Sequence, residues 1–276
     1  MPIDAPFPGL EEFVAAVGEA GQRLSQIDAS EGAAGNISVY LGWPVEPGSD
    51  FPHEEAIAFP AAVPALAGGS LLVTGSGRRL REILRDPPAN LGLVRVGEGG
   101  RTGRLFTSPR RLFDRLTSEI DSHLGVHQDQ VGRTGTNFHA VVHAQPVFLT
   151  YLSHIPRYQD EELLSRHLLR WQPETVVNLP EGVGVVPFLV PGTAELAGAT
   201  SRSLRSHRIA VWSKHGVVAR SDRSVKRAVD RIEYAETAAR YEYMNLTSGE
   251  AGRGLSEKEV DRIRRAFGNA KPRRRR

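Results

Sequence analysis

Cysteine is absent from the 276 residues. This absence excludes disulfides and thiolate chemistry, so any metal ion must be held by histidine, by carboxylates or by amide oxygens. The sequence also has no apolar run long enough to cross a bilayer, and its beginning, MPIDAPFPGLEEF, lacks the basic and then apolar pattern of a signal peptide. We therefore expect a cytoplasmic protein with no membrane partner.

The chain has an ordinary globular composition, with 40% hydrophobic and 24% charged residues. Its length is ample for a sizeable core, and we find neither an internal repeat nor a change of composition that would mark a second domain. We expect residues 1–268 to form one α/β domain.

The net charge of +3 comes mostly from the last residues, KPRRRR, which hold five positive charges. Without them the chain would be weakly acidic. Such a tail is typical of a solvated, disordered end, and no aromatic-basic motif accompanies it. We expect residues 269–276 to be disordered and nucleic acid not to be a partner.

Hydrophobic periodicity predicts helices over 10–27, 224–246 and 255–267, where Ser256 and Glu259 form a capping-box pattern. Residues 43–69 are rich in proline and glycine and predict a long irregular excursion. Runs of β-branched and apolar residues predict strands from residue 37 and over 70–75, 91–96, 139–144, 175–179, 182–189 and 208–213.

Two glycine-containing turns could bind an anion. GAAGNIS (32–38) precedes a strand, and VTGSGRRLREI (73–83) leads from a buried strand into a helix. Small residues leave backbone N–H groups accessible, and a helix N-terminus favours negative charge. Alone, GAAGNIS is more typical of a plain turn before a strand, and VTGSGRRLREI is equally compatible with a structural strand-to-helix turn.

The segment LTSEIDSHLGVH (116–127) also has two interpretations. In the structural one, Ser118 caps a helix, Asp121 completes the capping box and Glu119 favours the helix dipole. In the functional one, Glu119 is a general base at the mouth of a site. His123 and His127 are four residues apart on one helix face, which is more typical of a core or surface pair than of a metal site.

The stretch HAVVHAQPVFLTYLSH, starting at His139, resembles a metal site with one ligand missing. On a strand, His139, His143 and Gln145 share one face. In VWSKHGVVARS, His215 ends a strand before a glycine turn. Histidines at strand ends in separate segments can converge on one metal ion.

Taken in order, these pieces resemble the class II, metal-dependent aldolases of the adducin-like superfamily. The resemblance covers most of the chain and rests on AAGNISV, LLVTGSGRRLREI, TSEIDSHL, VVHAQP and VWSKHGV. DPPANLG and LPEGVGVVPFLVPGT favour the branch that cleaves L-rhamnulose 1-phosphate over its fuculose- and ribulose-phosphate relatives. The resemblance implies a single three-layer α/β/α domain with a largely antiparallel central sheet, assembled as a homotetramer.

The resemblance also implies an activity and a site. The reaction yields dihydroxyacetone phosphate and L-lactaldehyde through an enediolate that a divalent cation stabilises. The implied metal ligands are His143, Gln145 and His215, and the implied catalytic carboxylates are Glu119 and Glu174. The positions that would hold the substrate phosphate are Gly35, Asn36, Ser76, Gly77 and Ser118.

Gln145 departs from the family pattern, which has a second histidine of a His-x-His pair at this position. An amide oxygen is a weaker ligand for Zn²⁺ than imidazole and suits Mn²⁺ or Mg²⁺. His139 or a carboxylate could complete the ligand set instead. Two alternatives stay open: a related aldolase or epimerase acting on another sugar phosphate, and a non-catalytic, adducin-like interaction protein.

Overall fold

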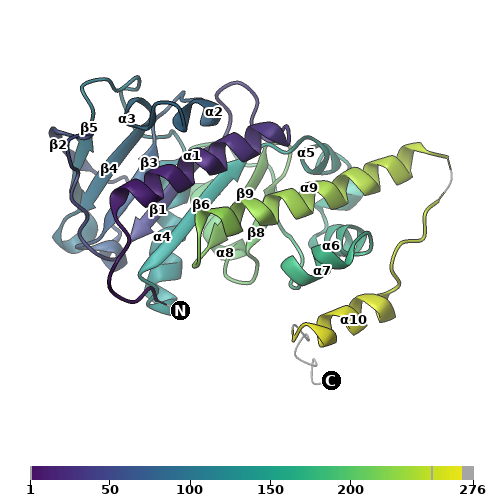
Figure 1. The fold of residues 1–276 in the computed structure, drawn as a ribbon. Coiled ribbons are helices and arrows are strands. Elements are labelled where there is room, and N and C mark those ends of the chain that lie inside the picture. Colours follow the sequence, from purple (N-terminus) through teal and green to yellow (C-terminus); the bar gives the residue numbers. More distant parts are fainter. Residues whose placement is uncertain (1, 250, 269–276) are drawn as a thin grey trace.

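A nine-stranded sheet forms the centre of the molecule (Figure 1). The computed structural model describes residues 2–249 and 251–268, so the expected disorder of the tail at 269–276 lies outside the described residues. The strand order is β2-β5-β4-β3-β1-β6-β9-β8-β7, and every neighbouring pair is antiparallel except β7 and β8.

The strands are β1 (Asn36–Leu41), β2 (His53–Ala58), β3 (Ser70–Thr74), β4 (Leu91–Val96), β5 (Thr102–Thr107), β6 (Phe138–Ala144), β7 (Gly184–Val186), β8 (Ile209–Trp212) and β9 (Gly216–Ser221). The helices are α1 (Leu10–Gln26), α2 (Leu80–Ile83), α3 (Pro87–Asn90), α4 (Ile120–Thr134), α5 (Val147–Leu152), α6 (Glu161–Leu169), α7 (Pro173–Asn178), α8 (Ala194–Ser203), α9 (Val225–Thr247) and α10 (Glu257–Ala266). Short 3₁₀ helices lie at Pro64–Leu66, Glu98–Gly100 and Pro156–Gln159.

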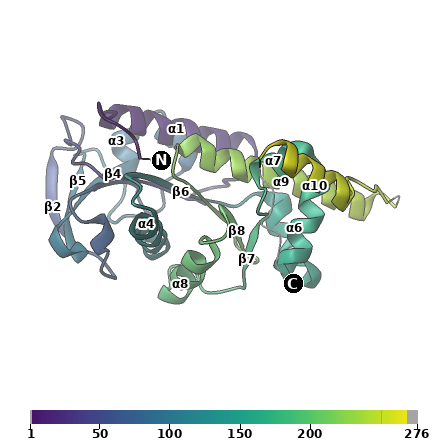
Figure 2. The ribbon, with the colours of Figure 1, turned by 90° about the horizontal axis from the view of Figure 1, so that it is seen from below.

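Helices cover both faces of the sheet. Figure 2 shows α1 and α9 on one face and α4 and α8 on the other, with α6, α7 and α10 beside the end of the sheet that carries β7. The predicted three-layer α/β/α architecture with a largely antiparallel sheet is therefore confirmed. Among the described residues, none of the helices is both long and apolar enough to span a membrane.

The central strand β6 shows how the two faces are built. Ala140, Val142 and Ala144 are fully buried in the core that α1 and α9 share with the sheet. Val141 points to the opposite face, where it packs in a cluster with Val126 of α4. Full burial of a valine side chain stabilises a fold by about 1.5–3 kcal/mol, so this alternation fixes the side to which every other residue of β6 points.

The long helix near the C-terminus and the opening helix were predicted correctly as α9 and α1. The capping box that begins α10 is also confirmed: the Glu259 amide donates to Ser256 Oγ, and the Ser256 amide donates to the Glu259 carboxylate.

Two strand predictions differ from the structure. Residues 175–179 were expected to be a strand, but 175–178 belong to α7 and Leu179 follows the helix as its C-cap residue. Pro173 suits the first helical turn, and Val176 is buried in the core from a helix. The strand expected over 182–189 is shorter, since β7 ends at Val186, and Pro187 has no N–H to continue the ladder.

Two further expectations are also wrong. The region 43–69 is not wholly irregular, because it contains the exposed edge strand β2, which pairs with β5. Its flanking prolines and glycines conceal this strand in the sequence. Ser118 does not cap α4, since the helix begins at Ile120 and Glu119 occupies the N-cap position without a side-chain capping bond. The Glu119 carboxylate has other partners.

Candidate metal centre

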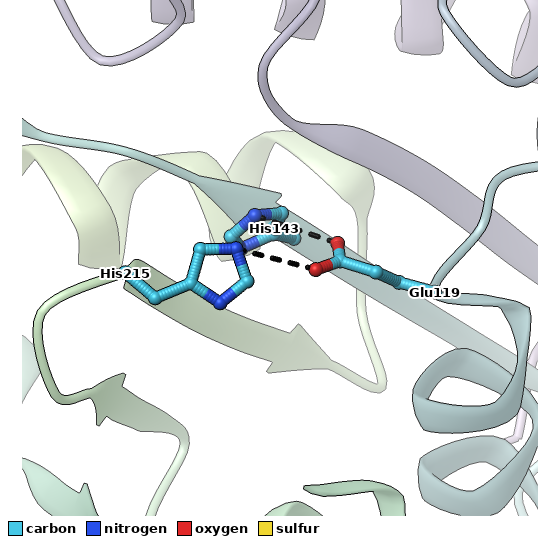
Figure 3. A group of neighbouring side chains, drawn as sticks. All are labelled: Glu119, His143 and His215. Atoms are coloured by element: carbon cyan, nitrogen blue, oxygen red, sulfur yellow. Dashed lines mark ion pairs between the residues drawn. The ribbon is translucent and has the colours of Figure 1, made fainter. Parts of the chain in front are cut away.

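Three side chains from separate elements meet at one end of the central strands. Glu119 precedes α4, His143 lies near the end of β6, and His215 lies in the turn between β8 and β9. Figure 3 shows both imidazole rings facing the carboxylate. His143 Nε2 lies 3.4 Å from Glu119 Oε2, and His215 Nε2 lies 3.3 Å from Glu119 Oε1. One ligand atom from each side chain lies within 4.8 Å of the other two.

The backbone determines which nitrogen of His143 is free. His143 Nδ1 lies 2.8 Å from the carbonyl oxygen of Val217. A carbonyl only accepts hydrogen bonds, so Nδ1 carries a proton and Nε2 is the nitrogen that faces the cluster. This buried ring therefore presents its Nε2 to the cluster, in the arrangement that orients metal-binding histidines in proteins.

The indole of Trp212 holds both histidines. Its ring lies 4.6 Å from that of His143 and 5.1 Å from that of His215, centroid to centroid. The Trp212 Nε1–H donates to Thr200 Oγ1 at 2.8 Å, which anchors the indole within the core. Lys214 adopts a positive φ of 64° in the tight turn that carries His215.

Burial favours the neutral form of His215. The loss of solvent, together with the neighbouring His143, lowers the pKa of His215 to about 4 against the opposing effect of Glu119. His215 Nδ1 is buried and has no hydrogen-bond partner in the part of the chain that the structure describes. A neutral imidazole is the form that binds a metal ion.

The Glu119 carboxylate is buried but remains ionised. Burial tends to raise the pKa of the carboxyl, but His143, the hydrogen bond from Asn36 and His215 together outweigh it and hold the pKa below its ordinary value. Asn36 Nδ2 donates to Glu119 Oε2 at 2.8 Å, from the first residue of β1. An ionised carboxylate beside two imidazole nitrogens is a donor set suited to a divalent cation.

The spacing of these atoms also fits a metal ion. Two atoms that each bind a tetrahedral Zn²⁺ at about 2.1 Å lie about 3.4 Å apart. The two carboxylate–imidazole separations of 3.3 and 3.4 Å match this value. Glu119, His143 and His215 could therefore hold a divalent ion between them.

Gln145 lies beside this cluster, one residue beyond the end of β6. A Cβ placed on Gly216 would lie 3.1 Å from both Gln145 Cγ and His143 Cε1, so the two side chains border the same glycine. The backbone N–H of Gln145 donates to the backbone carbonyl of Ala29 at 2.8 Å. Gln145 also lines a groove of about 1030 Å³ that none of the three cluster residues lines. Its role as a ligand stays a prediction.

His139 is not a member of the cluster, although it shares a face of β6 with His143 as predicted. Its Nδ1 lies 2.9 Å from His127 Nδ1, deeper in the core. Of the two groups that could complete the ligand set, the structure places a carboxylate, that of Glu119, beside the histidines.

The residues predicted to bind phosphate come from three segments of the chain, and hydrogen bonds from backbone amides connect these segments. The Ile37 amide donates to Thr74 Oγ1 at 3.2 Å, and the Thr117 amide donates to the Thr74 carbonyl at 3.0 Å. Gly35, with φ +86°, lies so close to β6 that a Cβ there would be 2.9 Å from the His143 carbonyl oxygen.

Within this frame the predicted phosphate-binding residues differ in exposure. Ser76 is half-buried and its backbone amide donates to the Arg115 carbonyl at 2.9 Å, whereas Gly77 and Ser118 are exposed. Asn36 is buried, with its side-chain amide between Glu119 and His123. Their binding of phosphate stays a prediction.

Glu174 lies apart from the cluster. It is exposed near the start of α7, where its backbone carbonyl accepts from Asn178 Nδ2 at 2.8 Å. Within the described residues of this chain, its carboxylate does not join the three-residue group. Its catalytic role also stays a prediction.

Sequence reasoning missed one residue of the site and one contact within it. The missed residue is Trp212, which stands three residues before His215. Trp212 ends β8, and the tight turn that follows places the His215 ring against its indole. The contact of Asn36 with Glu119 joins residues 83 positions apart, and no local pattern indicates it.

This chain is similar in sequence to known proteins. The class II aldolase and adducin N-terminal domain, as a sequence family, matches residues 15–243. The rhamnulose-1-phosphate aldolase of Klebsiella pneumoniae (strain 342) is 30% identical over 217 residues, covering 78% of this chain and 77% of that protein. The rhamnulose-1-phosphate aldolase of Bacteroides thetaiotaomicron is 28% identical over 262 residues, covering 94% and 96%.

A solved structure shares the fold. The crystal structure of a sugar-phosphate aldolase from Thermotoga maritima superimposes with a TM-score of 0.73 at 27% sequence identity, covering 89% of this chain and 99% of that one.

Proposed function

Because the chain belongs to the class II aldolase and adducin family, we propose that it is a metal-dependent aldolase that cleaves L-rhamnulose 1-phosphate to dihydroxyacetone phosphate and L-lactaldehyde. The observation that carries this proposal is the convergence of an ionised carboxylate and two imidazole nitrogens, one of them turned towards the cluster by the backbone partner of its ring. We propose further that the enzyme acts in the cytoplasm as a homotetramer.

His143 and His215 would hold the ion, with Glu119 or Gln145 as a further ligand. When bound, a divalent cation supplies an electron sink for the negative charge that develops on the substrate oxygens. Zn²⁺ suits the two imidazoles, while Mn²⁺ or Mg²⁺ would suit a set that includes the amide oxygen of Gln145.

Glu119 is the group that we assign to proton transfer. In the cleavage direction, the C–C bond next to a substrate hydroxyl breaks and its electron pair moves towards the carbonyl. The hydroxyl proton leaves to a base, and the carbon that keeps the electron pair later gains a proton. A buried, ionised carboxylate can accept the first proton and return it, and Glu174 is the second carboxylate that we propose to take part.

The turn containing Ser76 and Gly77, together with Gly35, Asn36 and Ser118, is proposed to hold the substrate phosphate. The hydrogen bonds that join these three segments bring backbone amides and hydroxyls to the same end of the sheet as Glu119. Phosphate held there would place the remainder of the substrate towards the histidines.

A turnover assay tests the proposal. Purified protein supplied with Zn²⁺ or Mn²⁺ should release dihydroxyacetone phosphate from L-rhamnulose 1-phosphate faster than from L-fuculose 1-phosphate. Glu119→Gln should lower kcat by about 10²- to 10⁴-fold with little change in KM, since a general acid/base contributes about that factor. Glu11→Gln, which alters an exposed carboxylate on α1, is the matched control.

The outcomes separate the candidate functions. Faster cleavage of another sugar phosphate would reassign the substrate and keep the reaction. Absence of cleavage together with absence of stoichiometric metal would favour the non-catalytic, adducin-like alternative.

A further inference from the structure

A line of buried polar groups leads away from Glu119 into the core between the sheet and α4. Glu119 Oε2 accepts from Asn36 Nδ2 at 2.8 Å, and Asn36 Oδ1 makes a short contact with His123 Nε2. On the other side of this ring, His123 Nδ1 lies 2.6 Å from Ser38 Oγ. Asn36 and Ser38 are two residues apart on β1, so they share a face of the sheet.

The line continues through two further histidines. Ser38 Oγ lies 2.7 Å from His127 Nε2, and His127 Nδ1 lies 2.9 Å from His139 Nδ1. The three histidines of the line, His123, His127 and His139, are at most 1% exposed. His139 Nε2 is buried and has no hydrogen-bond partner among the described residues, so the line ends there.

All three rings are neutral. Burial lowers the pKa of His123 to about 3 and that of His139 to about 3, the latter with help from Arg220 and Arg231. Burial and the neighbouring His139 also lower the pKa of His127 well below its ordinary value. Each ring therefore has one N–H donor and one bare nitrogen acceptor.

Neutral rings make the line directional, starting from its first link. The Glu119 carboxylate accepts only, so Asn36 turns its NH₂ group towards it and its carbonyl oxygen towards His123. That oxygen also accepts only, so the proton of His123 is on Nε2. His123 Nδ1 is then bare, and the Ser38 hydroxyl donates to it.

The remaining links follow the same rule. With its single proton committed to His123, Ser38 Oγ accepts from His127 Nε2–H. His127 Nδ1 is then bare and accepts from His139 Nδ1–H. The line ends on a bare His139 Nε2, which leaves an unpaired acceptor rather than an unpaired N–H donor in the core.

We propose that Ser38, His123, His127 and His139 are positioning residues, which lock the Asn36 amide with its NH₂ group on Glu119. Reversing any one link would place two donors or two acceptors face to face, so the other links resist the reversal. An amide does not relay protons between its oxygen and its nitrogen under ordinary conditions, so the line acts by orientation and not as a proton path. Its effect on catalysis rests on the proposed function; the direction of its hydrogen bonds does not.

The direction can be measured without any activity. In the metal-free protein with ¹⁵N-labelled histidine, long-range ¹H–¹⁵N correlation spectra identify the protonated ring nitrogen of each neutral histidine. We expect the proton on Nε2 of His123 and His127 and on Nδ1 of His139. A proton on Nδ1 of His123 or on Nε2 of His139 would overturn the inference.

Two substitutions at one position test the positioning role. His123→Phe removes the donor to Asn36 but fills the space, whereas His123→Gln can place an amide N–H where Nε2–H lies. Loss of the groups that orient a metal site costs about 10- to 100-fold in metal affinity or activity. We expect this loss of kcat and of Zn²⁺ affinity in His123→Phe, little change in KM, and substantial recovery in His123→Gln.

His207→Phe is the matched control, because His207 is also buried but bonds Ser203 and Ser206 outside the line. Folded His123→Phe with wild-type kcat and Zn²⁺ affinity would refute the positioning role. If the protein cleaves no sugar phosphate, the proposed function fails, and the NMR spectra and Zn²⁺ titration still decide the inference.

Discussion

The three buried histidines His123, His127 and His139 should make the protein unusually sensitive to mild acid. An unfolded histidine has a pKa of about 6.5 and binds a proton as the pH falls below that value. In the folded protein the pKa of His123 and that of His139 are about 3, and the pKa of His127 is well below 6.5. The unfolded state therefore binds more protons, and stability falls as the pH drops from about 6.5 towards about 3.

The expected loss at pH 5.5 can be worked out from these directions. At this pH the folded rings remain neutral, so the loss depends only on protonation of the unfolded chain. Each histidine then costs about 1.4 kcal/mol relative to pH 8, and the three together cost about 4 kcal/mol. A typical domain has a free energy of unfolding of about 5–15 kcal/mol, so this loss is a large part of the total.

Urea unfolding in the presence of a chelator, at pH 8 and pH 5.5, measures the difference for the metal-free protein. His127→Gln should lower stability at pH 8 but reduce the pH-dependent loss by about one third. Val141→Ala, which opens a cavity on the same strand as His139, is the control that lowers stability and leaves the pH dependence as in wild type. Equal pH-dependent losses in wild type and His127→Gln would refute the reasoning.

Three other substitutions test the surroundings of the site. Ser76→Ala should raise KM for the phosphorylated substrate and leave kcat/KM for the unphosphorylated ketose as it is; equal losses on both would argue against a phosphate role. Gln145→His should tighten Zn²⁺ binding by about 1–2 kcal/mol in a chelator-competition titration, and unchanged affinity would place Gln145 outside the ligand set. Gly216→Ala should destabilise the protein by about 1–3 kcal/mol, because its Cβ would lie 2.5 Å from the Ala144 carbonyl oxygen. Gly198→Ala in α8 is its control in thermal unfolding. The added Cβ would lie 3.4 Å from its nearest neighbour, Arg202 Nη1, so this change should not destabilise the protein.

The periodicity of apolar residues predicted those helices and strands whose buried face follows from the local sequence. Alternation along β6 placed His139 and His143 on one face, and helical spacing gave α1, α9 and the capped start of α10. It failed at residues 175–179, where β-branched residues indicate a strand. The proline before them and the burial of Val176 from a helix outweigh that preference.

Only part of the predicted site comes together in the structure, since Glu174 lies apart and the role of Gln145 stays a prediction. Glu119, His143 and His215 followed from motifs, and the structure brings them together. The contacts from Asn36 to Glu119 and His123 cross 83 and 87 positions, and they arise only when β1 packs against the start of α4. A pair of histidines on one helix face gives no sign of the strand groups that will bond it.

The metal content of the purified protein tests the central claim most directly. Elemental analysis of wild type should find about one divalent ion per chain. His143→Ala and His215→Ala should each lose most of it and all measurable cleavage of L-rhamnulose 1-phosphate, while circular dichroism shows an intact fold. His154→Ala, which alters an exposed histidine, should keep both. Full metal occupancy in His143→Ala or His215→Ala would contradict the assignment of these two histidines as the ligands.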